Sequence, residues 1–330
     1  MNRRIPAGET LRQDVLNRLR KAGFLLAGTA PVQPEAGDCA ALDAYLENGC
    51  HASMAYLARN ARMMKRPTEF EPWVRGAFCV ALPYNTRSET SAETVESGSG
   101  WISRYAWGRD YHKVLKARLR PVARYLRENG KHARVCVDSA PVLERALARL
   151  AGLGFIGKNT MLINPRFGSY LFLGEILTDM ALPPGDPVPD GCGRCTRCLE
   201  GCPTGAFARP RILDARRCLS MWTIEHRGPF TADTPELGGH LFGCDRCQEV
   251  CPYNRKAPMS IDPDFRPRPG WFAPEPETVS RLQETEWDRR TRGMALRRAG
   301  YAGLLRNSRR VEKEKRTAGQ TKSDDTDVSS

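Results

Sequence analysis

Two stretches rich in cysteine decide the fold of the C-terminal half: CGRCTRCLEGCP at residues 192–203 and CDRCQEVCP at residues 244–252. Together with Cys218 they contain eight of the twelve cysteines in this chain of 330 residues. Both end in the pattern Cys-x3-Cys-Pro. Disulfide frameworks belong mainly to short secreted chains, whereas thiols at two-residue spacing in a long chain indicate metal binding.

The first stretch has the spacing with which bacterial ferredoxins bind 4Fe–4S clusters, and its fourth cysteine then ligates the other cluster. This exchange predicts a first set of Cys192, Cys195, Cys198 and Cys251, and a second set of Cys202, Cys218, Cys244 and Cys247. Zinc is the alternative, because four-cysteine zinc sites also use two-residue gaps. Zinc ribbons do not need the Cys-Pro ending, however, and they do not need it twice. We therefore predict two 4Fe–4S clusters and a redox protein.

The residues before the cysteines alternate between helical patterns and short apolar runs. Helices are predicted over 9–22, 40–46, 111–129 and 142–150, and strands over 76–82, 134–137, 161–163 and 170–177, with a loop at 85–100. This alternation indicates an α/β (or α+β) domain. The predicted organisation is that domain over 1–182, a cysteine domain over 183–260, a Pro-rich wrap with a basic helix over 261–316, and a disordered tail over 317–330.

The formal net charge of +13 favours a polyanionic partner. Residues 289–316 contain nine Arg and two Lys against two Glu. Apolar residues lie among these arginines, which indicates a docked basic helix; a solvated helix face is the alternative. The mean hydropathy is −0.50 and no apolar stretch reaches the length of a membrane span. Charged residues also interrupt the N-terminal segment, so that no export signal is expected and the location is predicted to be cytoplasmic.

Short motifs in a fixed order cover nearly the whole chain, and in this order the chain resembles the epoxyqueuosine reductases. The matching segments are Met54–Asn60, Arg104–His112, Val137–Arg145, Gly152–Thr160, Leu173–Ile176, both cysteine stretches, Trp222–Glu225 and the segment from Arg297 to Asn307. The resemblance implies a cobalamin-binding domain of the reductive-dehalogenase type, a ferredoxin-like double 4Fe–4S domain and a basic C-terminal helical segment. It also implies a reaction in which the epoxide of epoxyqueuosine in tRNA becomes an alkene, with two electrons and two protons consumed and water lost.

Asp138 matches the proton donor of that family. A carboxylic acid that delivers a proton must be protonated near neutral pH, which requires burial or neighbouring negative charge. A helix cap ahead of Pro141 is the alternative role for this residue.

The resemblance places a cobalamin beside the first cluster. The nearest approach to an Asp-x-His-x-x-Gly motif is Asp110-Tyr111-His112, which lacks the Gly. We therefore expect a base-off cobalamin without a histidine ligand, and core or surface roles for the histidines. The expected cofactor contacts are Arg59, Arg104, Tyr105, Asp138, Lys158, Asn159, Ser169 and Ser220; for Lys158 and Asn159, an ordinary Gly-rich turn is the alternative.

The expected partners are tRNA carrying epoxyqueuosine and an external electron donor, with no membrane and a monomeric chain. Arg297, Arg298 and Arg306 are the predicted phosphate contacts, which position tRNA without reading its sequence. Two other functions remain open. A ferredoxin-type electron carrier would not need the domain before residue 182. A dehalogenase-like corrinoid enzyme acting on a small molecule is disfavoured by the basic segment. Trp101 and Trp107 either stack on a base or belong to the core.

Overall fold

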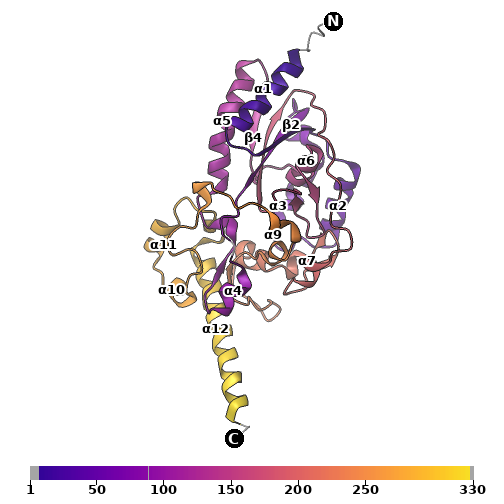
Figure 1. The fold of residues 1–330 in the computed structure, drawn as a ribbon. Helices are drawn as coiled ribbons and strands as arrows, with labels where there is room; N and C mark the ends of the chain where they lie inside the picture. The colour runs from indigo at the N-terminus through magenta and orange to yellow at the C-terminus, as the bar shows by residue number, and fades with distance from the viewer. Residues whose placement is uncertain (1–6, 88, 328–330) are drawn as a thin grey trace.

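A four-stranded antiparallel sheet forms the centre of the N-terminal part in the computed structural model, which describes residues 7–87 and 89–327 (Figure 1). The strand order is β1 (Leu26–Pro31), β2 (Gly76–Pro83), β7 (Leu171–Thr178) and β4 (Ala133–Cys136). All neighbouring strands are antiparallel, with Cys79 opposite Glu175 and Cys136 opposite the same glutamate. The fold is thus a mixed α+β fold, as the sequence predicted.

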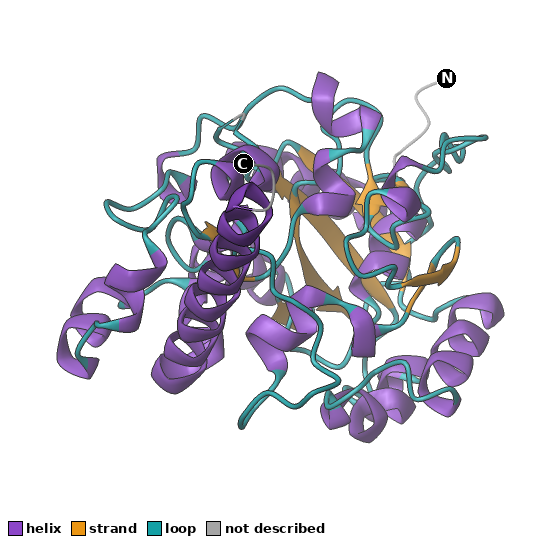
Figure 2. Cartoon of the chain, turned by 90° about the horizontal axis from the view of Figure 1, so that it is seen from below, coloured by secondary structure: helices purple, strands orange, loops and turns teal. Residues whose placement is uncertain are grey.

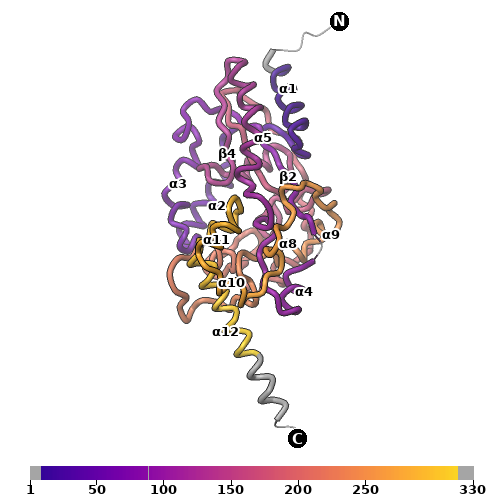
Figure 3. The backbone as a smooth tube through the Cα atoms, turned by 90° about the vertical axis from the view of Figure 1, so that its left-hand side faces the viewer, coloured from indigo at the N-terminus to yellow at the C-terminus, as the bar shows by residue number. Residues whose placement is uncertain are grey.

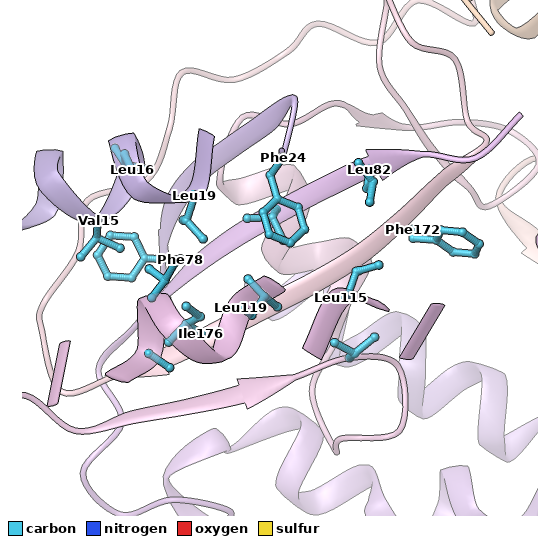
Figure 4. Packing of buried hydrophobic residues seen from close by; sticks show 14 of the residues in the cluster. Val15, Leu16, Leu19, Phe24, Phe78, Leu82, Leu115, Leu119, Phe172 and Ile176 are labelled. Atoms are coloured by element: carbon cyan, nitrogen blue, oxygen red, sulfur yellow. The ribbon is translucent and has the colours of Figure 1, made fainter. Parts of the chain in front are cut away.

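Helices cover both faces of the sheet, which explains why the residues of β2 are all apolar or Gly and all buried. Side chains alternate between the two faces of a strand. Phe78 and Leu82 accordingly join the cluster under α1 (Ala7–Lys21) and α5 (Tyr111–Glu128), as Figure 4 shows. Ala77 and Cys79 join the cluster on the opposite face, where α6 (Glu144–Leu150) packs. The helices α2 (Ala36–Glu47) and α3 (Ala55–Lys65) lie on the side away from α1 (Figures 1 and 3).

A second core gathers residues from both halves of the chain. Trp101 and Trp107, both 0% exposed, pack with the C-terminal residues Trp271, Leu296 and Leu304. The strand β3 (Trp101–Ile102) pairs with β10 (His240–Phe242). The packing therefore crosses the boundary expected at residue 182, and both tryptophans are core residues rather than stacking platforms.

The C-terminal helices are α10 (Pro276–Ser280), α11 (Glu284–Thr291) and α12 (Gly300–Asp327). The far end of α12 extends away from the body of the molecule in Figure 1, and in the view from below this helix lies in front of the other elements (Figure 2). Residues 317–327, expected to be a disordered tail, are helical, and 328–330 lie outside the described residues. None of the described helices has the length and apolar character needed to cross a membrane.

The other differences from the predicted elements are local. The loop expected at 85–100 contains α4 (Ser91–Glu96), which begins with a capping box between Thr90 and Glu93. The helix expected from residue 142 begins at Glu144. Other short elements are β5 (Phe155–Ile156), β6 (Leu162–Ile163), α7 (Arg197–Glu200), β8 (Phe207–Arg209), β9 (Ile212–Leu213), a π-helix (Met221–Glu225), α8 (Arg246–Glu249) and α9 (Pro252–Lys256). Short 3-10 helices cover Pro67–Glu69, Arg104–Ala106, Ala215–Arg217, Pro263–Phe265 and Ala295–Ala299.

Candidate functional site

The structure brings the eight cysteines together in the two predicted sets. The first set lines a single cavity of about 420 Å³. Burial raises the pKa of Cys198 to about 11, and the charges of Cys192, Cys251 and Cys195 act in the same direction. In the second set, burial raises the pKa of Cys247, and the thiols that add to this effect are Cys244, Cys218 and Cys202. Each set therefore combines cysteines from both motifs.

Backbone amides point at the sulfur atoms of both sets. The amide of Lys158 donates to Cys192 Sγ at 3.4 Å, and the amide of Ala206 donates to Cys202 Sγ at 3.3 Å. Within the described part of the chain, no three His, Cys, Asp or Glu side chains form a group that could hold a single metal ion. Four cysteines from both motifs line the cavity of the first set, and four cysteines are the ligand set that a 4Fe–4S cluster uses.

Lys158 and Asn159 lie between the two cysteine motifs. Lys158 Nζ donates to the carbonyl oxygens of Gly193 and Cys195 at 2.8 and 3.0 Å. Asn159 Nδ2 donates to the carbonyl oxygen of Cys247 at 3.3 Å. Both side chains therefore fix the loops that carry the thiols, so that their role is more specific than that of an ordinary Gly-rich turn.

Arg104 and Ser169 are also committed to internal contacts. Arg104 is 3% exposed; its backbone amide donates to Asp245 at 2.9 Å, and its guanidinium donates to the side chain of Asn85 and the carbonyl oxygen of Arg87. Ser169 is 1% exposed, and its hydroxyl donates to Gln248 at 3.0 Å. These two residues support the second cysteine motif from inside. Ser220 hydrogen-bonds Cys218, and Arg59 is exposed on α3 one turn after Tyr56.

Asp138 is the centre of a separate polar constellation at the end of β4. Its side chain is 56% exposed, and its carboxylate accepts hydrogen bonds from Tyr111 Oη at 2.8 Å and His112 Nε2 at 3.0 Å. The other ring nitrogen of His112 lies 2.8 Å from Asp110 Oδ1. The backbone of Asp138 has φ of +57°, in the left-handed region that Asp tolerates better than most residues.

The pKa shifts in this constellation differ from the prediction that Asp138 is protonated near neutral pH. Burial acts to raise the pKa of Asp138, but hydrogen bonds from His112 and Tyr111 and the charge of His112 outweigh it and lower the pKa. Burial acts to lower the pKa of His112, and its hydrogen bonds to Asp110 and Asp138 raise it to about 9. At neutral pH Asp138 is therefore a carboxylate, and His112 carries the proton. The sequence prediction of a core or surface role for His112 did not include this contact, which depends on the packing of α5 against β4.

Two further carboxyl groups stand behind Asp138. The backbone amide of Asp138 donates to the Glu144 carboxylate. Burial and the charge of Asp138 raise the pKa of Glu144 to about 8. Glu175, in the middle of β7, is 0% exposed, and burial raises its pKa well above the usual value, with the charge of Glu144 as the next cause. Burial thus favours the neutral form of Glu175. This pair supports the loop of Asp138 from the interior of the sheet.

The three predicted tRNA-binding arginines have different surroundings. Arg298 forms a bidentate pair with Glu225 at 2.9 and 2.7 Å, and both Asp138 and Tyr56 contribute to its raised pKa. Arg297 pairs with Asp288 at 2.7 Å and lies over the Trp287 ring. Arg306 donates to the carbonyl oxygens of Trp222, His226 and Gly228. Arg298 alone lies beside the Asp138 constellation.

The second cysteine set lies on the side of Asp138. Asp245 follows Cys244 directly, and its charge raises the pKa values of both Tyr84 and Tyr105, after the larger effect of burial. For Tyr105 the charge of Asp138 is the next cause after burial. The ring of Tyr105 lies 6.1 Å from that of Tyr111, which donates to Asp138, and 5.8 Å from that of Phe242, two residues before Cys244. Tyr105 therefore lies between Asp138 and the second set.

The fold and these two sites define an iron–sulfur reductase, with thiol sets to carry electrons and a protonated His–Asp pair beside them. Comparisons with known proteins agree. The family model described as "Epoxyqueuosine reductase QueG, DUF1730" matches residues 65–139, and that of a "4Fe-4S double cluster binding domain" matches residues 191–254. Epoxyqueuosine reductase of Pseudomonas aeruginosa is 43% identical, over 92% of this chain and 85% of the relative. The Salmonella typhimurium enzyme is 38% identical, over 90% and 78%. The chain belongs to the epoxyqueuosine reductase family.

Solved structures of that family share the fold. A crystal structure of an epoxyqueuosine reductase with an epoxyqueuosine-modified tRNA-Tyr stem loop matches with a TM-score of 0.84 and 26% identity, over 92% of this chain and 81% of the other. A structure of the Bacillus subtilis enzyme, in which the loop of the catalytic aspartate is swung out of the active site, matches with a TM-score of 0.83 at 26% identity, with the same coverage.

Proposed function

We propose that this protein reduces the epoxide of epoxyqueuosine in tRNA to an alkene. The reaction consumes two electrons and two protons and releases water. The observation that carries the proposal is the Asp138–His112–Tyr111 constellation, which holds a proton next to a thiol set suited to electron transfer. Membership of the family and the stem-loop complex of a relative support the choice of substrate. We infer that the protein acts as a monomer in the cytoplasm, where tRNA is modified.

The two cysteine sets are proposed to hold two 4Fe–4S clusters in the exchanged arrangement. Electrons from an external donor pass from the first cluster to the second, and from there toward Asp138. The grouping of the thiols and the amides directed at their sulfur atoms support this assignment.

A cobalamin is proposed to lie between the second thiol set and Asp138. The chain has a polar atom suited to an amide of the corrin edge, because His51 Nδ1 is buried without a hydrogen-bond partner. Ser53, two residues further along the chain, contacts Met221, three residues after Cys218. Arg59, Tyr105 and Ser220 are the further proposed contacts. His112 is held by two carboxylates, which supports a base-off cofactor without that ligand. When bound, the cofactor would supply the reducing electrons at the substrate.

Proton delivery is proposed to run from His112 through Asp138. His112 is an imidazolium at neutral pH and donates to the Asp138 carboxylate. As the carbon–oxygen bond breaks, Asp138 relays the His112 proton to the epoxide oxygen in one concerted step. His112, with a side chain 29% exposed, regains a proton from solvent and delivers the second one by the same path. Tyr111 holds the carboxylate in place throughout.

The test is reconstitution without oxygen, followed by turnover of tRNA that contains epoxyqueuosine. Nucleosides from the digested tRNA are separated and identified by mass spectrometry. We expect queuosine from the wild-type protein and a loss of at least about 100-fold in Asp138→Asn, with unchanged iron content. A wild-type protein that holds both clusters and cobalamin but leaves epoxyqueuosine intact refutes the proposal.

A further inference from the structure

The electrons for this reaction must come from outside the chain, and the first cysteine set lies where an outside donor can approach. Seven of the eight cysteines are partly exposed, and the first set opens onto a cavity that Arg197 and Lys256 also line. Burial is the main cause that raises the pKa values of Cys218, Cys244 and Cys247, so the second set lies deeper in the protein. Electrons that arrive from solvent therefore reach the first set before the second.

Positive charge surrounds this point of access. Arg197 and Lys256 line the cavity of the first set, and a second hollow shares Arg197 and adds Arg255. Arg194 lies between two cysteines of the set, and all four of these side chains are exposed. We call these four residues, Arg194, Arg197, Arg255 and Lys256, the basic cluster face.

Little negative charge offsets the basic cluster face. Among the described residues that line the two hollows, Glu200 is the one carboxylate, and it accepts a hydrogen bond from the Thr196 hydroxyl at 2.5 Å. Asp190, near the rim, is paired with Arg211. The face thus presents a net positive surface directly over the first thiol set.

We infer that the basic cluster face docks a small acidic electron-transfer protein, of the flavodoxin or ferredoxin type, which delivers electrons to the first cluster. This inference rests on the proposed function only in that both need the clusters. Each docked carrier is oxidised by one electron and the first cluster is reduced by one, so that two encounters supply the two electrons of the reaction. Complementary charge raises the association rate more than the final affinity, which suits a carrier that must leave after each transfer. Weak redox complexes also use small interfaces, below about 1,200 Å².

A polyanionic tRNA is the other partner that positive charge would attract. The position of the face favours the carrier, because it covers the thiols of the first set, whereas Asp138 lies on the side of the second set. A role in tRNA binding is therefore tested as an opposing outcome.

The experiment compares Arg194→Glu/Arg255→Glu with a control of equal charge change, Arg120→Glu/Arg124→Glu, at exposed positions of α5. Neither Arg194 nor Arg255 lines the cavity of the first set. Cluster-loaded proteins are mixed anaerobically with a reduced acidic flavodoxin, and the bleaching of cluster absorption is followed by stopped flow without any tRNA. Binding of the oxidised flavodoxin is measured separately by calorimetry, and dithionite serves as a small reductant that needs no docking.

We expect the flavodoxin rate at low salt to fall at least about 10-fold in Arg194→Glu/Arg255→Glu and to lose most of its salt dependence, with weaker flavodoxin binding. The control should stay within about 2-fold of wild type, and dithionite should reduce all three proteins equally. An unchanged flavodoxin rate, or a loss of tRNA affinity in its place, overturns the inference. If the double variant loads less iron, Arg255→Glu alone, outside the cysteine loops, decides by the same rates. No step of this experiment involves epoxyqueuosine, so its outcome does not depend on the turnover assay that tests the proposed function.

Discussion

Replacement of His112 by Gln tests the proton path most directly. Gln retains an amide that can donate to Asp138, but it carries neither a charge nor a proton to transfer. A pKa near 9 in the folded protein, against 6.5 for a free imidazole, corresponds to up to about 3 kcal/mol at about 1.36 kcal/mol for each pH unit between them. This stabilisation comes from the hydrogen bonds to Asp110 and Asp138.

The sign of the pH dependence follows from the raised pKa. The stabilisation is fully present below the unfolded value of 6.5 and is lost as the pH rises through about 9. The free energy of unfolding of the wild type should therefore contain a component that declines from about pH 6 to about pH 10, and His112→Gln should lack it. Urea unfolding at several pH values measures this difference, and His132→Gln, at an exposed ring stacked on Trp73, is the matched control.

The rate of catalysis should also depend on the protonation of His112. General acid catalysis contributes about 10²–10⁴-fold, so we expect His112→Gln to reduce the rate of epoxyqueuosine reduction about 100-fold near pH 7.5. The wild-type rate should fall above about pH 9, and the variant should lack this alkaline limb. An NMR titration of the imidazole reports its pKa independently of turnover. A value near 6.5, or a variant with the rate and pH profile of the wild type, refutes the proton path.

Three further predictions concern the cysteine sets, the Asp138 loop and the basic helix. Cys251→Ala should lose about half of the bound iron, because one of two four-iron clusters loses a ligand, whereas Cys39→Ala, outside both sets, should keep all of it in a colorimetric iron assay. Glu144→Ala should remove the acceptor of the Asp138 backbone amide, lower turnover about 10-fold and speed hydrogen exchange at that amide. Glu144→Gln should restore part of both, and an unchanged exchange rate contradicts this role. Arg306→Ala should lower the free energy of unfolding, measured in urea, by about 2–3 kcal/mol, because three backbone carbonyls lose their donor. Arg309→Ala is the neutral control. Unaltered stability together with weaker tRNA binding would show that Arg306 contacts tRNA and does not stabilise the fold.

The cysteine pattern predicted the site better than any other feature, because iron–sulfur ligation depends on short spacing along the chain. The exchange of Cys202 and Cys251 between sets follows from the same spacing, and the structure groups the thiols accordingly. Strand β2 was equally clear, since a strand covered on both faces must be apolar throughout. In contrast, β1 and α3 were not predicted. The sequence of β1, LAGTAP, has few of the residues that favour strands, and its place is set by pairing with β2.

The His112–Asp138 pair was beyond prediction for a different reason. The two residues lie 26 positions apart, on separate elements, and no sequence motif links them. Their contact depends on how α5 packs against β4, which involves the whole apolar face of the helix. The sequence indicated Asp138 through family resemblance, but its ionisation depends on a neighbour that only the fold supplies.

The arginines of residues 289–316 show why charge density alone does not define a binding surface. Arg297 and Arg306 satisfy a carboxylate and backbone carbonyls of this chain, and burial lowers the pKa of Arg306 to about 10. Arg298 pairs with Glu225, and it lies beside Asp138, the proposed site of reduction. A phosphate or base that approaches Asp138 therefore meets an arginine already oriented by a carboxylate, and this preorganisation reduces the entropy lost on contact. Of the three predicted tRNA contacts, Arg298 is thus the one whose position fits the proposed reaction, whereas Arg297 and Arg306 bond to other parts of this chain.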